Sequence, residues 1–478
     1  MQLVNKPNIL WICTDQQRFD SLGCYGNSFV KTPNIDRLAE NGFLFNNAFC
    51  QAPVCTPSRA SFLTGRYPRT TRCRENGQDI PEDEILIPKI LRDEAGYYCG
   101  LSGKLHLSAC DPEVTPDTER RIDDGYDEFH WSHNPRPGSS GNQYRQWLEK
   151  QGLQFITPEF ENSKYVEKGM SSEYHQTRWC ADRAIGFIND REIDAKPWLF
   201  SVNIYDPHHP FDPPEEYLRP YLEKLDDIPL PDFVEGELDN KPYFQHLPIE
   251  MHYHFKEMSD KDHKLVKAAY WAMIDNIDVQ VGRMIEALEK TGQLEDTIVI
   301  FTSDHGEMLG DHGIYLKGPY FYEQAVKVPL IISMPGIIKQ GVKSDALVEL
   351  VDLAPTIIES IGMQKDETMQ GRSFWNMLTG HSNPDSHRKS VYCEYYKALK
   401  CHEDPSAYAT MVRNQRYKIV RIHGLGEGEL YDLEKDPGEI HNCWDNKAYS
   451  EVKTVMLELM CDRMAWTIDP KPLRKAWW

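Results

Sequence analysis

The sequence predicts an α/β fold in which a large mixed, mostly parallel sheet is sandwiched by helices. Between Asn8 and Ile361, short apolar runs of strand length alternate with segments whose apolar residues recur at helical spacing. Such alternation is typical of a parallel sheet covered on both faces. Beyond Gly380, short strands follow one another instead. We therefore expect an α/β domain over residues 1–380 and a smaller C-terminal α+β subdomain, containing an antiparallel sheet, over residues 381–478.

The first predicted strand, residues 8–13, is an apolar run followed by Thr14, Asp15 and Gln16. This pattern is typical of a buried parallel strand with polar residues at its carboxyl end. Thr32 and Pro33 favour a helix start, and Gly42 favours its end. The same criteria predict helices over residues 85–95, 269–288 and 353–361, and strands over residues 97–101, 198–204, 297–302 and 328–333.

The C-terminal subdomain is predicted to contain strands over residues 391–396, 408–412, 417–422 and 429–431, followed by a helix over residues 450–465. Two polar stretches, residues 108–174 and 211–260, are long for simple connections, so we expect them to shape a substrate pocket. In open α/β sheets, ligands bind beyond the carboxyl ends of the strands. Asp15, Lys104, Asp206 and Asp304 each follow a predicted strand. These positions predict the site of the chemistry.

The charge of the chain restricts its partners. A formal net charge of -21 argues against nucleic acid or an anionic membrane as a partner, since both require a basic surface. An anionic substrate must then be held by a local cluster of cations. The sequence has no apolar run long enough to cross a membrane, and residues 1–7 do not resemble a secretory signal. As written, the chain is expected to be cytoplasmic; a removed signal peptide would make it periplasmic or secreted.

The 12 cysteines form no CxxC pair, so we expect most of them to be small buried thiols in a reducing compartment. Cys55 is different, because it precedes Thr56, Pro57, Ser58 and Arg59. A nearby arginine and the amino end of a helix both stabilise a thiolate. Cys55 is thus either a reactive cysteine or a structural thiol.

The Cys55–Arg59 segment resembles the signature of the formylglycine-dependent type I sulfatases, which belong to the alkaline phosphatase superfamily. The resemblance implies that a formylglycine-generating maturation enzyme oxidises Cys55. The hydrated aldehyde, a geminal diol, would attack the sulfur of a sulfate ester, and its second hydroxyl would then help to expel sulfate. Arg59 would stabilise this nucleophile.

The resemblance also implies one divalent metal, held by Asp15, Gln16, Asp304 and His305 together with the modified Cys55. Such a metal lowers the pKa of the nucleophilic hydroxyl and neutralises the sulfate oxygens. Gln16 stands where sulfatases often have a second Asp, and His305 where they often have Asn. We expect Ca²⁺. Mn²⁺ is the alternative, because fewer carboxylates weaken a calcium preference and an imidazole admits transition metals.

Further motifs resemble the sulfate-binding positions of the family. Lys104 and His106 match its lysine and histidine pair, and Lys317 matches its second sulfate-binding lysine. His208 matches the histidine that protonates the leaving oxygen, although the adjacent His209 could take this role. Asn76 is expected either to contact the substrate or only to form a turn before Gly77.

Taken together, these motifs predict hydrolysis of a sulfate monoester. We expect a small sulfated substrate, a saccharide, because His130, Trp131, His133 and Arg136 in the first polar stretch suit a sugar with further anionic groups; the same residues could instead pack that stretch. The alternatives are a phosphonate monoester or phosphodiester hydrolase with the same apparatus, and a non-catalytic protein that binds sulfated glycans. The sequence does not indicate an oligomeric state.

Overall fold

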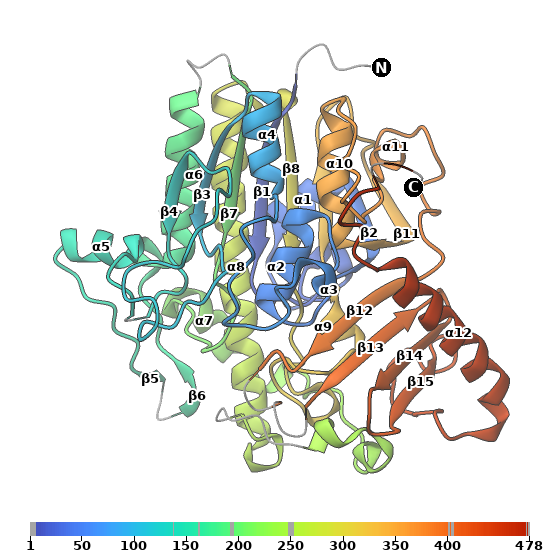
Figure 1. Cartoon of the computed structure of the whole chain (residues 1–478). Helices are drawn as coiled ribbons and strands as arrows, with labels where there is room; N and C mark the ends of the chain where they lie inside the picture. The colour runs from blue at the N-terminus through green and yellow to red at the C-terminus, as the bar shows by residue number, and fades with distance from the viewer. Residues whose placement is uncertain are drawn as a thin grey trace.

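The computed structural model describes residues 6–136, 138–160, 163–191, 196–246, 253–399, 402, 406–474 and 476. Its main sheet has nine strands among these residues, in the order β11-β2-β10-β8-β1-β7-β3-β4, with β9 paired to β2 (Figure 1). The strands are β1 (Asn8–Thr14), β2 (Phe43–Phe49), β3 (Tyr98–Gly103), β4 (Glu128–Trp131), β7 (Trp198–Asn203), β8 (Thr297–Ser303), β9 (Lys327–Val328), β10 (Leu330–Ser333) and β11 (Val342–Glu349).

The centre of this sheet is parallel. β1 lies between β7 and β8 and pairs with both in parallel, with Leu10 opposite Phe200 on one side and Val299 on the other. Among the described strands of this main sheet, only β10 and the short β9 run antiparallel to the strands they pair with. The predicted strand over residues 328–333 is divided into β9 and β10 at Pro329, which has no N–H for the ladder. The prediction of a mixed, mostly parallel sheet is confirmed.

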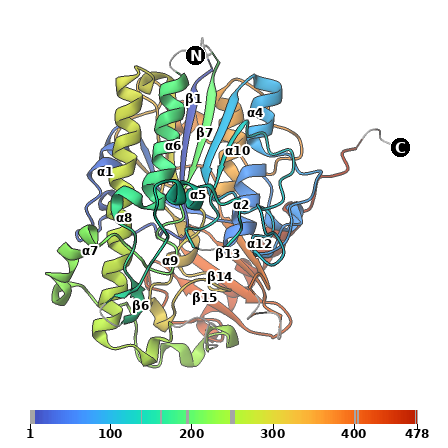
Figure 2. The ribbon, with the colours of Figure 1, turned by 90° about the vertical axis from the view of Figure 1, so that its left-hand side faces the viewer.

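Helices cover both faces of the sheet. Successive side chains of β1 point to opposite faces, so Ile9 and Trp11 belong to one apolar core and Leu10 and Ile12 to another. The Leu10 face is covered by α1 (Pro33–Glu40), α6 (Gln176–Arg191) and α8 (Asp260–Lys290). The opposite face is covered by α2 (Cys55–Thr64), α4 (Ile87–Ala95) and α10 (Leu353–Ser360), and Figure 2 shows the three layers from the side.

A second, antiparallel sheet follows in the chain, in the order β12-β13-β14-β15. Its strands are β12 (Val391–Tyr396), β13 (Tyr408–Arg413), β14 (Tyr417–Ile422) and β15 (Gly428–Asp432), and α12 (Ser450–Trp466) packs on them (Figure 1). The buried carboxylate of Glu349, at the end of β11, lies 2.7 Å from the Arg463 guanidinium of α12. This ion pair ties the small sheet to the large one.

The long polar stretches contain elements of their own. Within them lie β4, α5 (Gln143–Lys150), β5 (Glu159–Phe160), β6 (Ser163–Glu167) and α7 (Glu215–Leu222). No helix in the described part of the chain is both long and apolar enough to cross a membrane. Of the 11 described cysteines, seven are buried and all are free, as expected for structural thiols; Cys401 lies outside the described residues.

Two carboxylates of α8 hold the start of α1. Asp278 accepts hydrogen bonds from the backbone N–H groups of Asn34 and Ile35, which have no partner within the helix. Asp275 accepts hydrogen bonds from the Lys31 N–H at 2.7 Å and the Tyr221 hydroxyl at 2.9 Å. Burial nevertheless raises the pKa of Asp275 to about 7 and that of Asp278 to about 6.

The raised pKa of Asp275 predicts a pH-dependent stability. Between about pH 4 and about pH 7 the folded state keeps a proton that the unfolded state has lost, so the free energy of unfolding falls as pH rises. The Asp275→Asn substitution removes this contribution. The difference in melting temperature, Asp275→Asn minus the unchanged protein, should therefore increase as the pH is raised from about 5 to about 8. A difference that stays constant over this range, as expected for the exposed control Asp296→Asn, would contradict the prediction.

Candidate active site

The polar residues that follow four neighbouring strands meet at one edge of the sheet. The backbone N–H of Asp15 donates to the carbonyl of Asp206, and that of Asp304 donates to the carbonyl of Thr14, each at 3.2 Å. The N–H of Lys104 donates to the carbonyl of Asn203 at 3.0 Å. The carboxyl ends of β1, β3 and β8 thus place Asp15, Lys104 and Asp304 around a common centre, as the strand pattern predicts. The carboxylate of Asp206, after β7, instead accepts a hydrogen bond from the Thr177 hydroxyl at 2.6 Å.

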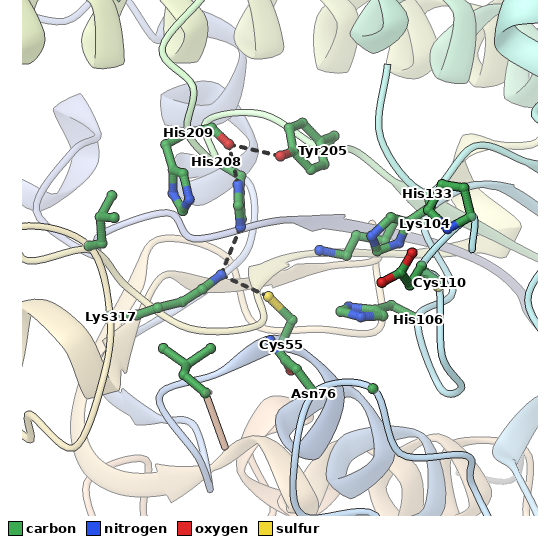
Figure 3. A pocket seen from close by; sticks show the side chains of 15 residues that line it. Cys55, Asn76, Lys104, His106, Cys110, His133, Tyr205, His208, His209 and Lys317 are labelled. Atoms are coloured by element: carbon green, nitrogen blue, oxygen red, sulfur yellow. Dashed lines mark hydrogen bonds between the residues drawn. The ribbon is translucent and has the colours of Figure 1, made fainter. Parts of the chain in front are cut away.

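Cys55 lies at this centre. It is the first residue of α2 and is buried. Its Sγ atom lies 2.9 Å from Lys317 Nζ (Figure 3). It also lies 3.2 Å from His305 Nε2 and 3.5 Å from Asp15 Oδ1. Asn76 Oδ1 accepts a hydrogen bond from the Thr56 N–H at 3.1 Å, which satisfies one amide at the amino end of α2.

The surroundings of Cys55 favour its ionised form. Burial and the carboxylate of Asp15 oppose ionisation of the thiol. Lys104, Lys317 and His305 outweigh them, and the pKa of Cys55 is lowered from its usual value. Burial raises the pKa of the other described thiols for which a shift is found, such as Cys13 and Cys99. Cys55 therefore differs electrostatically from the structural cysteines.

Acidic and imidazole groups converge beside Cys55. One ligand atom from each of Asp15, Cys55, Asp304 and His305 lies within 4.8 Å of the others. His305 Nδ1 donates to the Gly306 carbonyl at 2.8 Å, so Nε2 is the ring nitrogen that faces Cys55 Sγ and the carboxylates. This Nε2 lies 3.8 Å from an oxygen of Asp15 and 3.8 Å from an oxygen of Asp304. The cluster can therefore hold a divalent cation.

Gln16 lies next to this cluster, because its backbone N–H donates to Asp304 Oδ1 at 3.0 Å, and its side chain offers a further candidate ligand. Its Nε2 donates to Glu307 and lies 3.2 Å from His209 Nδ1. Its Oε1 is buried and has no hydrogen-bond partner among the described residues. A buried amide oxygen without a partner is unfavourable unless another group binds it. Two carboxylates, an amide oxygen and an imidazole nitrogen fit a hard or borderline divalent metal.

The Arg59 guanidinium pairs with both carboxylates of the cluster. Its Nε lies 2.8 Å from Asp304 Oδ2, and its Nη2 lies 3.7 Å from Asp15 Oδ2. Its Nη1 donates to the Lys104 carbonyl at 2.9 Å. Lys104 Nζ also pairs with Asp15. These cations hold the pKa of Asp15 well below its usual value despite burial, so the Asp15 carboxylate stays available as an anionic ligand.

His208 and Lys317 form a pair on the open side of Cys55. His208 Nδ1 donates to the His209 carbonyl, and His208 Nε2 accepts a hydrogen bond from Lys317 Nζ at 2.8 Å (Figure 3). Burial and the Lys317 ammonium hold the pKa of His208 well below its usual value. His209 instead contacts Gln16. The two adjacent histidines therefore face different parts of the site.

These groups open into a cavity of about 650 Å³. Six of the eleven predicted catalytic, substrate-binding and metal-ligating residues line it: Cys55, Asn76, Lys104, His106, His208 and Lys317. The remaining predicted residues, Asp15, Gln16, Arg59, Asp304 and His305, are buried behind them. All eleven lie in or against one site, although they come from seven separate segments of the chain.

Comparison with known proteins identifies the family. The family model Sulfatase matches residues 7–363. The chain belongs to the sulfatase family. The model N-sulphoglucosamine sulphohydrolase, C-terminal, matches residues 310–465 of this sulfatase, which covers the antiparallel sheet. The resemblance seen in the sequence is thereby confirmed, and the protein is a sulfuric ester hydrolase.

Individual relatives agree over nearly the whole sulfatase. It is 30% identical to an arylsulfatase of Clostridium perfringens over 462 residues, covering 93% of this chain and 92% of that one. It is 27% identical to an N-acetylglucosamine-6-O-sulfatase of Bacteroides thetaiotaomicron, covering 98% and 88%. The solved structure of a phosphonate monoester hydrolase of Agrobacterium radiobacter superimposes with a TM-score of 0.83 at 27% identity, covering 98% and 97%.

The polar stretch after β3 contributes less to the cavity of this sulfatase than its composition suggests. Of the four residues expected to suit a sugar, His133 lines the cavity. Trp131 is buried and donates to Glu119 at 2.7 Å, while Arg136 pairs with Glu167 at 2.6 Å. His130 lies 3.3 Å from Gln143. These three residues pack the stretch itself, the second of the two readings that the sequence left open.

Glu307 is a residue whose importance the sequence did not reveal. Its buried carboxylate accepts hydrogen bonds from Gln16 Nε2 and from the backbone N–H groups of Leu309 and Leu316. It thereby orients the Gln16 amide and fixes the loop that carries Lys317. Its place two residues after His305 is the only signal in the sequence. Tyr205, whose ring lies 5.5 Å from Lys104 Nζ and lines the cavity, gave no signal at all.

Proposed function

We propose that this sulfatase hydrolyses a sulfate monoester with a nucleophile generated from Cys55 by a formylglycine-generating maturation enzyme. The observation that carries the proposal is the position of Cys55 Sγ, between Lys317 Nζ and the carboxylates of the acidic cluster. Oxidation to formylglycine and hydration would place a nucleophilic hydroxyl where the sulfur lies. The modified residue would face the cavity, since Cys55 lines it.

We infer that one divalent cation is held by Asp15, Gln16, Asp304 and His305, together with residue 55. Bound there, it would supply positive charge that acidifies a hydroxyl and neutralises sulfate oxygens. The two carboxylates and the free Gln16 oxygen favour Ca²⁺, and the imidazole nitrogen of His305 admits Mn²⁺. Arg59 would hold the two carboxylates in place through its ion pairs and thereby stabilise the nucleophile indirectly.

The remaining residues bind the transferring group and move a proton. Lys104 and Lys317 place two ammonium groups around residue 55, where negative charge develops on the sulfate oxygens. Lys317 Nζ donates into Nε2 of His208, so transfer of that proton would make His208 the acid that protonates the leaving oxygen. His106 would hold the second hydroxyl of residue 55, and Asn76 would position α2 at the cavity floor.

We propose a sulfated saccharide as the substrate. A related protein is an N-acetylglucosamine-6-O-sulfatase, and the cavity is large enough for a sugar ring and lined by His133, Tyr205 and Asp111. Polar and aromatic side chains of this kind bind sugar hydroxyls and ring faces. Release of inorganic sulfate from a panel of sulfated saccharides should exceed release from small alkyl sulfates.

A phosphonate monoester or phosphodiester hydrolase is the second candidate. The structure of such an enzyme matches the whole chain, and Gln16 and His305 depart from the commonest sulfatase ligands. We expect kcat/KM for an aryl sulfate to exceed that for the matching aryl phosphonate by about tenfold or more. Both rates should be measured on the same preparation with the same leaving group. The reverse order of rates would favour the second candidate.

A further inference from the structure

A second cluster of metal-binding side chains lies in the wall of the cavity. His106 follows β3, His133 follows β4, and Cys110 lies on the loop between them. One nitrogen of each imidazole and the Cys110 sulfur lie within 4.8 Å of one another. Figure 3 shows the three side chains together, on the side of Cys55 away from Lys317. They share no residue with the acidic cluster around Asp15 and Asp304.

Both imidazoles of this cluster have nitrogen atoms without a partner. Nδ1 of His106 and Nδ1 of His133 are buried and make no hydrogen bond to any described residue. A neutral imidazole keeps a lone pair on one ring nitrogen, and this lone pair can bind a metal. Buried ring nitrogens without a partner are unfavourable unless a further group binds them.

The cluster is held in place by buried hydrogen bonds. The carboxylate of Glu119 accepts hydrogen bonds from the backbone N–H groups of His106 at 3.0 Å and Leu107 at 2.9 Å. It also accepts one from Trp131 Nε1 at 2.7 Å, two residues before His133. Glu119 thus fixes the chain next to both histidines. A ligand set on such a fixed scaffold loses little conformational freedom when it binds a metal.

We propose that His106, Cys110 and His133 form a second metal site, selective for a thiophilic divalent cation of the Zn²⁺ class. Two imidazoles and one thiolate are ligands that Zn²⁺ prefers, whereas Ca²⁺ and Mg²⁺ prefer oxygen. Binding displaces the Cys110 proton to solvent as the metal–sulfur bond forms. Because all three residues line the cavity, the fourth position of a tetrahedral ion is open to water or to a substrate oxygen.

The proposal is tested with Co²⁺, a coloured substitute for Zn²⁺, in protein that carries Cys55→Ser so that the Cys55 thiol cannot contribute. One equivalent of Co²⁺ should produce a sulfur-to-cobalt charge-transfer band in the near ultraviolet. Zn²⁺ should abolish the band stoichiometrically, and excess Ca²⁺ should leave it unchanged. Adding Cys110→Ser should remove the band and weaken Zn²⁺ binding, measured by calorimetry, by about 100-fold or more.

Two further variants make the result specific. Cys461→Ser, at an exposed position on α12, should leave the band unchanged in the Cys55→Ser protein. His133→Gln should weaken Zn²⁺ binding as Cys110→Ser does, and it tests the site independently if Cys110→Ser fails to fold by circular dichroism. No band with Cys110 intact, or a band that survives Cys110→Ser, would overturn the proposal. Neither result depends on sulfatase turnover or on formylglycine.

Discussion

Replacing Cys55 by alanine is expected to lower kcat/KM for a sulfate ester by about ten thousand-fold or more, as removal of a catalytic nucleophile does in other hydrolases. The effect should be this large because the lysines and carboxylates around residue 55 act on the atom that alanine lacks. Alanine fills less of the buried site but leaves α2 intact, so the protein should fold. Turnover is measured with an aryl sulfate after expression together with a maturation enzyme.

A matched control separates the chemistry from the loss of a thiol. Cys443→Ala changes a partly exposed cysteine after β15, far along the chain from the cavity residues, and should keep full turnover. Mass spectrometry of the peptide that contains residue 55 should show that the thiol of the unchanged protein has been replaced by an aldehyde. Full turnover by Cys55→Ala would exclude residue 55 as the nucleophile.

The centre of the fold could be predicted because its strands are buried on both faces. β1, β7 and β8 are continuous apolar runs, and their carboxyl ends are marked by polar residues. β2 and β11 were missed because Asn46 and Asn47 interrupt the first and Lys343 and Asp345 the second. Both lie at one edge of the sheet, where some side chains reach solvent, so the apolar signal is diluted.

The residues of the site were predictable to the extent that each lies in a short local motif. Cys55, Asp304 and Lys104 are recognised from their neighbours in the chain. Glu307 and Cys110 were not, because their roles depend on contacts between distant segments: Glu307 bonds to Gln16, and Cys110 lies beside His133. Hydrogen bonds and ligand sets of this kind are set by tertiary packing, which spacing along the chain does not encode.

Asp304→Asn is expected to remove the metal and to lower kcat/KM by about a thousand-fold or more, a larger effect than the 10- to 100-fold typical of residues that only support ligands. Asparagine is close in shape, and its oxygen can still accept a hydrogen bond from Arg59, as Asp304 does at 2.8 Å. The change removes one of two carboxylates while Arg59, Lys104 and Lys317 keep their positive charge. The excess positive charge should repel a divalent cation.

The metal content of purified protein distinguishes this explanation from a general loss of structure. Counting Ca²⁺ and Mn²⁺ apart from any Zn²⁺ at the second site, elemental analysis should show about one bound ion in the unchanged protein and much less in Asp304→Asn. Asp296→Asn, at the exposed opposite end of β8, should keep both its metal and its activity. Saturating Ca²⁺ or Mn²⁺ should partly restore turnover of Asp304→Asn, and the more effective ion identifies the preferred metal. If Asp304→Asn kept its metal but lost turnover, Asp304 would act on the substrate rather than on a cation, and Arg59 would be its partner in that role.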